Sequence, residues 1–171
     1  SPFCQIGTAP VTASGVTGGT YSASPTGLGI NGTTGELNLA TSLPGTYTVT
    51  YTYTTGICPD LRTTTILVTI NPKPAAPTIN IVQPICTLPT GRVTITSPAN
   101  GTNITYTITG TNPVVAAVTN STGVFTNLAS GRYNVTTTND AGCTSLPTFL
   151  TINTQPITPA APAASVTAQP T

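Results

Sequence analysis

The chain has 171 residues, of which only 4% are charged, and it carries a net charge of +1 with no His, Trp or Met. Intrinsic disorder usually accompanies high net charge and few β-branched residues, whereas Thr, Val and Ile are abundant here, so we expect a folded all-β chain. The four basic residues are scattered and form no basic stripe, which argues against nucleic acid as a partner. The sequence contains no run of 18 apolar residues, so it predicts no membrane span.

Runs of alternating apolar and polar residues predict strands along the chain. The run Thr46–Thr54 places three tyrosines and Val49 on one face and threonines on the other. The same period of two recurs at Thr65–Ile70, Arg92–Thr96 and Asn103–Thr109. Such alternation is typical of antiparallel sheets with one buried face, and Gly-rich turns separate the runs at the spacing of β-sandwiches. We therefore expect two tandem β-sandwiches.

The two halves of the chain are divergent copies of one plan. The stretch "PGTYTVT" (44–50) aligns with "SGRYNVT" (130–136), and "LVTINPKPAAP" (67–77) aligns with "FLTINTQPITPAAP" (149–162). A period near 80 residues indicates consecutive domains and not a solenoid. We expect a sandwich lacking its first strand (1–72), a Pro-rich linker (73–77), a second sandwich (78–154), a second linker (155–162), and the first strand of a following domain (163–171).

The two ends of the chain match parts of the second domain's start. In "INIVQPIC" (79–86) a strand leads to Gln-Pro and a cysteine. The tail "ASVTAQPT" (164–171) has the same form but stops before a cysteine would follow, and "SPFC" (1–4) begins at the matching Pro and Cys, so the first domain lacks its opening strand. The tail either begins the next domain of a tandem array, fills the vacant edge of a neighbouring chain's first domain, or is disordered. The candidate donated strand consists of Ala164, Val166, Ala168 and Gln169.

The four cysteines predict disulfides. Cys4, Cys58, Cys86 and Cys143 lie too far apart for a C-x-x-C site, and no His is available to complete a metal shell. Two disulfides in an oxidising compartment are the simplest interpretation. Of the three possible connectivities, the repeat favours Cys4–Cys58 and Cys86–Cys143, one in each domain.

Few residues suit catalysis or ligand binding. Glu36, Asp60 and Asp140 are the only carboxylates, and there is no His to act as a general base, so we expect neither an enzyme nor a metal or other cofactor. Tyr47, Tyr51 and Tyr53 could stack on a sugar, but the face that they share with Val49 suggests a core.

Two patterns resemble known families. The spacing Leu-x-Gly-x-Tyr at Leu43–Tyr47, with a variant ending at Tyr133, resembles the tyrosine corner of immunoglobulin-like domains. The stretches 19–53 and 125–145 resemble the Ig-like repeats of large secreted surface proteins of Bacteroidota, including gliding-motility adhesins. This resemblance implies type IX secretion, display at the cell surface and extended tandem arrays, although the usual sorting domain is missing.

The expected function is therefore structural. We expect a repeat unit of an extracellular filament or adhesin stalk, with self-association end to end by tandem linkage or by strand addition. The alternative hypothesis is a carbohydrate- or surface-binding module of a secreted adhesin.

Overall fold

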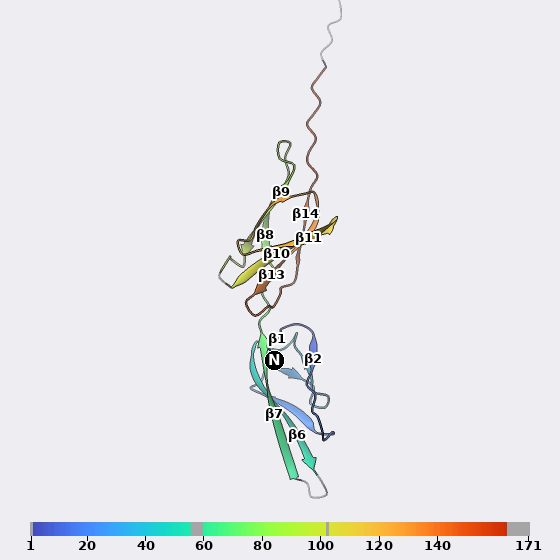
Figure 1. Cartoon of the computed structure of the whole chain (residues 1–171), viewed down its shortest axis with the longest axis vertical. Helices are drawn as coiled ribbons and strands as arrows, with labels where there is room; N and C mark the ends of the chain where they lie inside the picture. Colours follow the sequence, from blue (N-terminus) through green and yellow to red (C-terminus); the bar gives the residue numbers. More distant parts are fainter. Residues whose placement is uncertain (1, 56–59, 102, 164–171) are drawn as a thin grey trace, which may run out of the picture.

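The structure is a computed structural model that describes residues 2–55, 60–101 and 103–163. In this part of the chain fourteen strands form four sheets and no helix occurs, so the fold is all-β as the sequence predicts. Two groups of sheets follow one another along the long axis of the molecule (Figure 1). We call residues 2–71 the first unit and residues 78–152 the second unit.

The first unit has a four-stranded sheet of order β1-β7-β6-β3 and a three-stranded sheet of order β2-β5-β4. All described pairings are antiparallel except that of β1 with β7, which is parallel. The strands are β1 (Pro2–Cys4), β2 (Thr8–Pro10), β3 (Thr20–Ser24), β4 (Gly29–Ile30), β5 (Glu36–Asn38), β6 (Gly45–Thr55) and β7 (Asp60–Asn71).

The second unit also has one four-stranded sheet, β11-β10-β13-β14, and one three-stranded sheet, β12-β9-β8; β9, β12, β10, β13 and β14 correspond to β2, β5, β3, β6 and β7 of the first unit. The strands are β8 (Thr78–Val82), β9 (Gly91–Ser97), β10 (Ile104–Asn112), β11 (Val114–Asn120), β12 (Val124–Leu128), β13 (Gly131–Asn139) and β14 (Thr148–Ile152). Between β7 and β8 the chain forms no strand, in keeping with the three prolines of this stretch.

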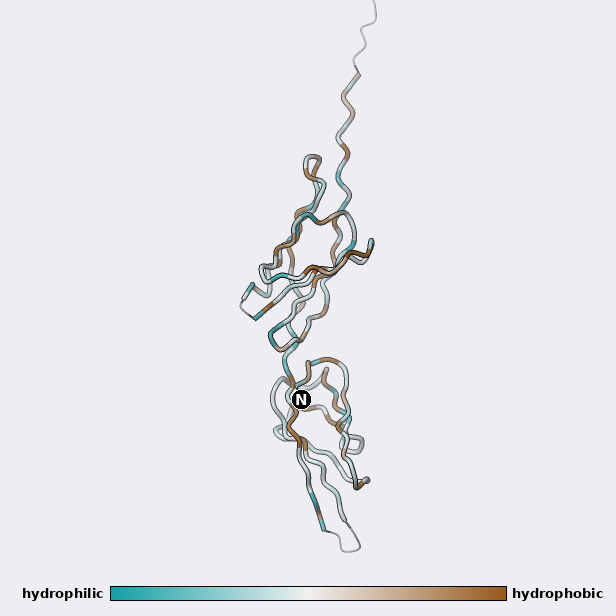
Figure 2. The backbone as a smooth tube through the Cα atoms, in the orientation of Figure 1, coloured by the Kyte–Doolittle hydropathy of each residue, from teal (hydrophilic) through white to brown (hydrophobic). Residues whose placement is uncertain are grey.

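Each unit buries its own hydrophobic core. Alternate residues of β6 point inward, so that Tyr47 and Val49 are buried among side chains from both sheets of the first unit. Tyr106 and Val135 are likewise buried in the core of the second unit. The far part of the β6–β7 hairpin is threonine-rich and mostly pale or teal in Figure 2, as expected for a ribbon outside either core.

Both units contain a tyrosine corner. The hydroxyl of Tyr47 donates a 2.7 Å hydrogen bond to the carbonyl oxygen of Leu43, and the hydroxyl of Tyr133 donates a 2.9 Å bond to that of Ala129. These are the bonds that the Leu-x-Gly-x-Tyr spacing predicts. Each one fixes the turn that leads into the central strand of the four-stranded sheet.

Backbone pairing shows which residues of the two units occupy equivalent positions. Ala9 of β2 pairs with Leu37 of β5, as Val93 of β9 pairs with Phe125 of β12. Two residues further on, Val11 N donates to Gly35 O, and Ile95 N donates to Gly123 O. Val11 therefore corresponds to Ile95, and β2 with its continuation is the counterpart of β9.

Candidate functional site

The two units differ at the edge of the smaller sheet. In the second unit β8 pairs along β9, with Ile81 opposite Val93 and Ile79 opposite Ile95. In the first unit β2 pairs only with β5 among the described residues, so its other edge has backbone groups without a strand partner. Unpaired edges of this kind accept an added strand.

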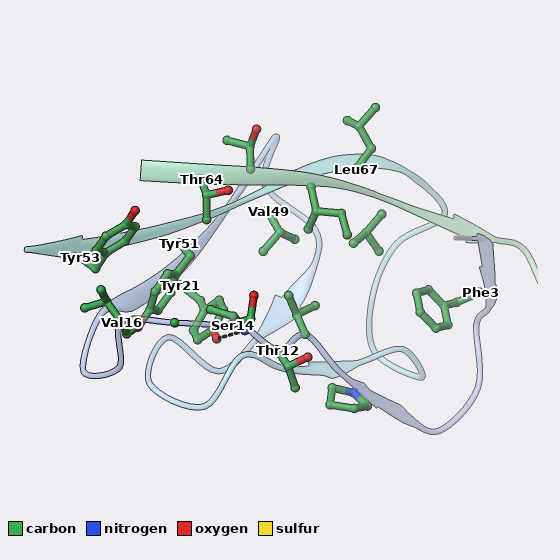
Figure 3. A pocket seen from close by; sticks show the side chains of 17 residues that line it. Phe3, Thr12, Ser14, Val16, Tyr21, Val49, Tyr51, Tyr53, Thr64 and Leu67 are labelled. Carbon is green, nitrogen blue, oxygen red and sulfur yellow. Dashed lines mark hydrogen bonds between the residues drawn. The ribbon is translucent and has the colours of Figure 1, made fainter. Parts of the chain in front are cut away.

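A groove of about 690 Å³ lies beside this open edge. Figure 3 shows Phe3 at one end of the groove and Val16 and Tyr53 at the other, with β7 along one wall. The opposite wall is the chain that continues from β2, including Thr12 and Ser14.

Tyrosine side chains hold that second wall in place. The Tyr51 hydroxyl accepts a 2.8 Å hydrogen bond from Gly19 N and donates a 3.0 Å bond to Val16 O. The Tyr21 hydroxyl accepts a 3.1 Å bond from Ala13 N. The ring centroids of Tyr21 and Tyr51 lie 4.6 Å apart, and those of Tyr51 and Tyr53 lie 5.6 Å apart. The segment thus keeps its position without being part of a sheet.

The groove occupies the place that β8 takes in the second unit. There Thr148 of β14 donates a 2.6 Å bond to Pro77 O at the start of β8, and Gln83, just after β8, donates to Thr151 O. β8 thus runs between β9 and β14, where Ile79 and Ile81 pack against the core. The counterparts of those neighbours in the first unit, β2 with its continuation and β7, are the walls of the groove.

Apolar side chains remain accessible along the groove. Ile66 of β7, the counterpart of Thr148, is 53% exposed, and Val16 is 42% exposed. A groove with accessible apolar side chains next to an open strand edge combines the two features that a strand-adding site needs: backbone groups for pairing and pockets for alternate side chains.

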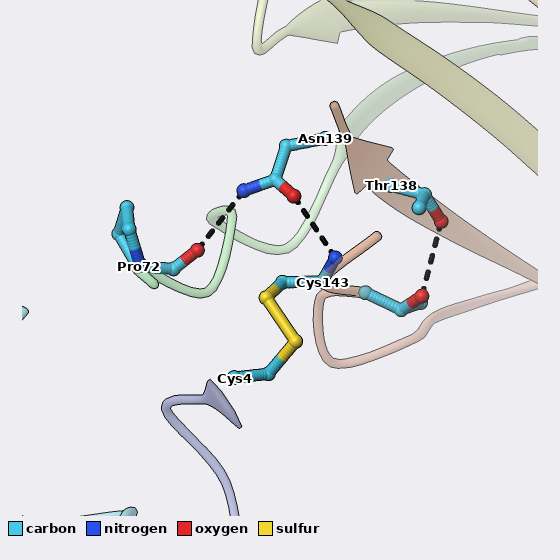
Figure 4. The surroundings of a disulfide bond; sticks show 6 residues. Cys4, Pro72, Thr138, Asn139 and Cys143 are labelled. Carbon is cyan, nitrogen blue, oxygen red and sulfur yellow. Dashed lines mark hydrogen bonds between the residues drawn. A yellow bond between two sulfur atoms is a disulfide. The ribbon is translucent and has the colours of Figure 1, made fainter. Parts of the chain in front are cut away.

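A disulfide joins the two units. Cys4, at the end of β1, is bonded to Cys143, in the loop after β13, with a Cα–Cα distance of 5.4 Å (Figure 4). Asn139 supports this joint, because its Nδ2 donates a 3.0 Å bond to Pro72 O and its Oδ1 accepts a 2.9 Å bond from Cys143 N. The expectation of one disulfide within each domain is therefore wrong.

Strand length explains the error. Cys4 pairs with Asn71 at the last residue of β7, whereas the other cysteine of the first unit, Cys58, precedes the first residue of β7 in sequence. A strand of 12 residues spans about 40 Å, and disulfide-bonded Cα atoms lie within about 7 Å. Cys4 lies at the end of β7 where the first unit meets the second, and there it is bonded to Cys143.

Several predicted residues lie outside the described part of the chain. These are Cys58 and the whole candidate donated strand, Ala164, Val166, Ala168 and Gln169. Cys86 is described; it is exposed and has no disulfide partner among the described residues. The predicted disulfide residues Cys4 and Cys143 are both bonded, but to each other.

The carboxylates are not gathered into a site. Glu36 begins β5, Asp140 follows β13, and Asp60 forms an exposed ion pair with Arg62. Within residues 2–55, 60–101 and 103–163 no three His, Cys, Asp or Glu side chains come together as metal ligands. No helix long and apolar enough to cross a membrane is found in the same residues.

Comparison of the sequence with models of protein families and with curated proteins gave no match.

Proposed function

We propose that this chain is a structural unit of an extracellular filament or adhesin stalk, in which units join end to end by strand addition. The single observation that supports this most is the open edge of β2 beside a groove with accessible apolar side chains, at the position where the second unit has β8. The resemblance to Ig-like repeats of Bacteroidota surface proteins, exported by the type IX system, supports the extracellular setting.

The proposed occupant of the groove is the segment 163–171 of a second copy. Ala164, Val166 and Ala168 alternate with polar residues, which gives the segment one apolar face for the groove and one polar face. Its main chain would pair with the edge of β2 and the residues that follow β2. Eight strand residues span about 26 Å, enough to follow one edge of a sandwich.

The direction of β8 gives the assembly a polarity. β8 is antiparallel to β9, and it starts beside Thr148 and ends near Thr151, so it runs parallel to β14. A donated strand in the same orientation runs parallel to β7 in the first unit of the next copy. The contact is heterologous, because a tail meets a groove, and heterologous contacts of this kind build open filaments.

The composition suits such a mechanical role. The chain has few charges, and a disulfide holds the two units together, so the joint within each copy is covalent in two places. The Pro-rich segments before β8 and after β14 favour extended spacers over flexible coils.

Sedimentation velocity of the full chain and of variants tests the proposal. The full chain should form polymers whose size grows with concentration, and deletion of residues 163–171 should leave a monomer with a folded second unit. Ile66→Lys should also block polymers, because it places a charge in the groove. Val118→Lys is the matched control, since Val118 lies on β11 with the same 53% exposure and should leave polymers intact.

Two results would contradict the proposal. Polymers that persist after deletion of residues 163–171 would show that the tail is not the donated strand. A full chain that stays monomeric at every concentration would exclude strand addition between copies and leave tandem linkage within one longer chain.

The tyrosines that line the groove favour a second candidate function, that of a carbohydrate-binding module. Tyr53 lines the groove and stacks on Tyr51, and accessible aromatic faces bind sugar rings. A glycan array with the isolated chain tests this: saturable binding that is lost in Tyr53→Ala favours the module over the filament unit.

A further inference from the structure

We propose that Pro10 keeps the open edge of β2 from pairing with the same edge of a second copy, while an added strand still binds there. The inference rests on the proposed function, because it takes this edge as the acceptor of the added strand. Main-chain hydrogen bonding is the same for every sequence, so an open edge that accepts one strand is also able to accept another edge like itself.

The hydrogen bonding of β2 shows which of its backbone groups face the open edge. Val11 N donates a 3.0 Å bond to Gly35 O, so the backbone groups of Val11 face β5. Successive residues of a strand turn their N–H and C=O groups to opposite edges. The residues whose backbone groups face the open edge are therefore Thr8, Pro10 and Thr12. All three are exposed.

Pro10 leaves a gap in this edge. Thr8 and Thr12 each offer an N–H donor and a C=O acceptor, whereas proline has no N–H and offers its C=O alone. The gap lies between the two threonines, so any strand that pairs along all three residues meets it. Proline on an edge strand, with its missing N–H on the open side, is one of the ways in which proteins limit edge pairing.

The second unit has a donor where Pro10 has none. Val11 is equivalent to Ile95, and the residue before Ile95 is Thr94. Ile95 N donates a 2.8 Å bond to a carbonyl next to β12, so the neighbouring Thr94 turns its N–H and C=O to β8, opposite Asn80. The edge that β8 covers within the unit thus has a threonine, and the edge that stays open has a proline.

The missing donor costs an added strand one hydrogen bond. Residues that face each other in an antiparallel hydrogen-bonded pair exchange two bonds. Opposite Pro10 the added strand keeps the bond from its N–H to the Pro10 carbonyl and loses the bond to its own carbonyl. One neutral hydrogen bond corresponds to about a fivefold change in a dissociation constant. Contacts with groove side chains such as Ile66 and Val16 do not depend on this bond.

Pairing between two open edges costs twice as much. Two copies that pair through the same edge are related by a two-fold axis, so their strands run antiparallel and each Pro10 faces the other copy. Two hydrogen bonds are lost, which corresponds to about a 25-fold change in the dissociation constant. Such a dimer would cover both acceptor edges and end growth. Pro10 therefore disfavours this contact more strongly than it disfavours strand addition.

Sedimentation equilibrium of a chain without residues 163–171 tests the inference, because the deletion removes strand addition as a source of larger species. Both buried clusters lie before residue 153, so the deletion leaves them intact. Pro10→Thr in this truncated chain should lower the dissociation constant of the dimer about 25-fold. The truncated chain should thus be monomeric at concentrations at which its Pro10→Thr variant is mostly dimeric, with nothing larger than a dimer.

A double variant is the matched control. Pro10→Thr combined with Thr12→Pro restores the donor at residue 10 and removes the donor two residues along the same edge. This truncated chain should be monomeric again, and circular dichroism verifies that it is folded. In the full chain, Pro10→Thr alone should form polymers at about fivefold lower concentration, because strand addition gains one hydrogen bond.

Three results would overturn the inference. The first is a truncated Pro10→Thr chain that stays monomeric at every concentration, and the second is a truncated chain that dimerises equally well with and without the substitution. The third is a folded double variant that dimerises as well as Pro10→Thr, which would show that loss of the proline ring and not gain of a donor sets the effect. Failure of the full chain to polymerise would contradict strand addition and would leave the result for the truncated dimers unchanged.

Discussion

Cys4 and Cys143 are separated by 139 residues in the chain, and their bonded sulfur atoms cross the boundary between the two units. The bond and the backbone connection at residues 72–77 link the units at two points, and Asn139 adds a third contact to Pro72. A double connection restricts rotation of one unit against the other more than a single linker does. We therefore expect the two units to sample a narrower range of relative orientations than a single linker would allow.

Removal of the interunit disulfide should loosen the joint without unfolding the units. In Cys4→Ser each core keeps its own contacts, because the two buried clusters share no residue. We expect a broader distribution of interunit angles, seen by small-angle X-ray scattering as a shorter mean maximum dimension. Cys86→Ser is the matched control and should leave the scattering of the monomer unchanged. Identical scattering of Cys4→Ser and the unchanged chain would contradict a mechanical role for the bond.

Loss of the tyrosine-corner hydroxyl should destabilise the first unit. Tyr47→Phe removes the bond to Leu43 O from a side chain that is 3% exposed, at a cost of about 1 kcal/mol in the free energy of unfolding. Tyr53→Phe on the same strand is the control, because Tyr53 is only half-buried. Denaturant titration measures both values. Equal midpoints for the two variants would argue against the corner as a stabilising feature.

A methyl group at Gly35 should disturb the edge of β2 next to the groove. Gly35 has φ of +75°, and a Cβ there would lie 2.4 Å from Val11 O, a backbone atom that cannot move freely. Gly142 has nearly the same φ, +76°, with nothing within 4 Å of a Cβ, so Gly142→Ala measures the cost of the backbone conformation alone. That cost is about 1 kcal/mol.

We expect Gly35→Ala to lower the free energy of unfolding by clearly more than Gly142→Ala does, as measured by thermal or denaturant unfolding. It should also weaken polymer formation, because Val11 forms part of the groove. Equal losses in the two variants would show that the positive φ alone, and not the contact with Val11, sets the effect.

Alkaline pH should destabilise the second unit through Tyr106. Burial raises the pKa of Tyr106 above its ordinary value of 10.0, and its hydroxyl donates to Pro98 O. Above about pH 10 the unfolded chain loses this proton while the folded chain retains it, so the free energy of unfolding falls as pH rises toward the raised pKa. Tyr106→Phe should show a smaller decline between about pH 9 and about pH 11. A parallel decline in both proteins would contradict the assignment.

The sequence predicts much of this fold because its strands follow a strict period of two. Thr46–Thr54 lies within β6, and the residues predicted to face inward, such as Tyr47 and Val49, are buried. The tyrosine corners were also predictable, since their bonds are local and depend on a fixed spacing of four residues between Tyr47 and Leu43.

The features that could not be predicted depend on how segments far apart in the sequence pack together. The pairing of Cys4 with Cys143 follows from the placement of two units end to end, which repeat alignment does not contain. The groove wall at residues 11–19 has no periodic pattern, because tyrosine hydroxyls and not a ladder hold it.

The most direct test of the account is high-resolution electron microscopy of polymers assembled from the full chain. We predict an additional strand on the open edge of β2, parallel to β7, with Ala164 of the preceding copy opposite Val11 and Val166 opposite Ala9. Continuous density should link Pro162 of one copy to that strand. Polymers in which the edge of β2 stays unpaired and the groove is empty would contradict the account.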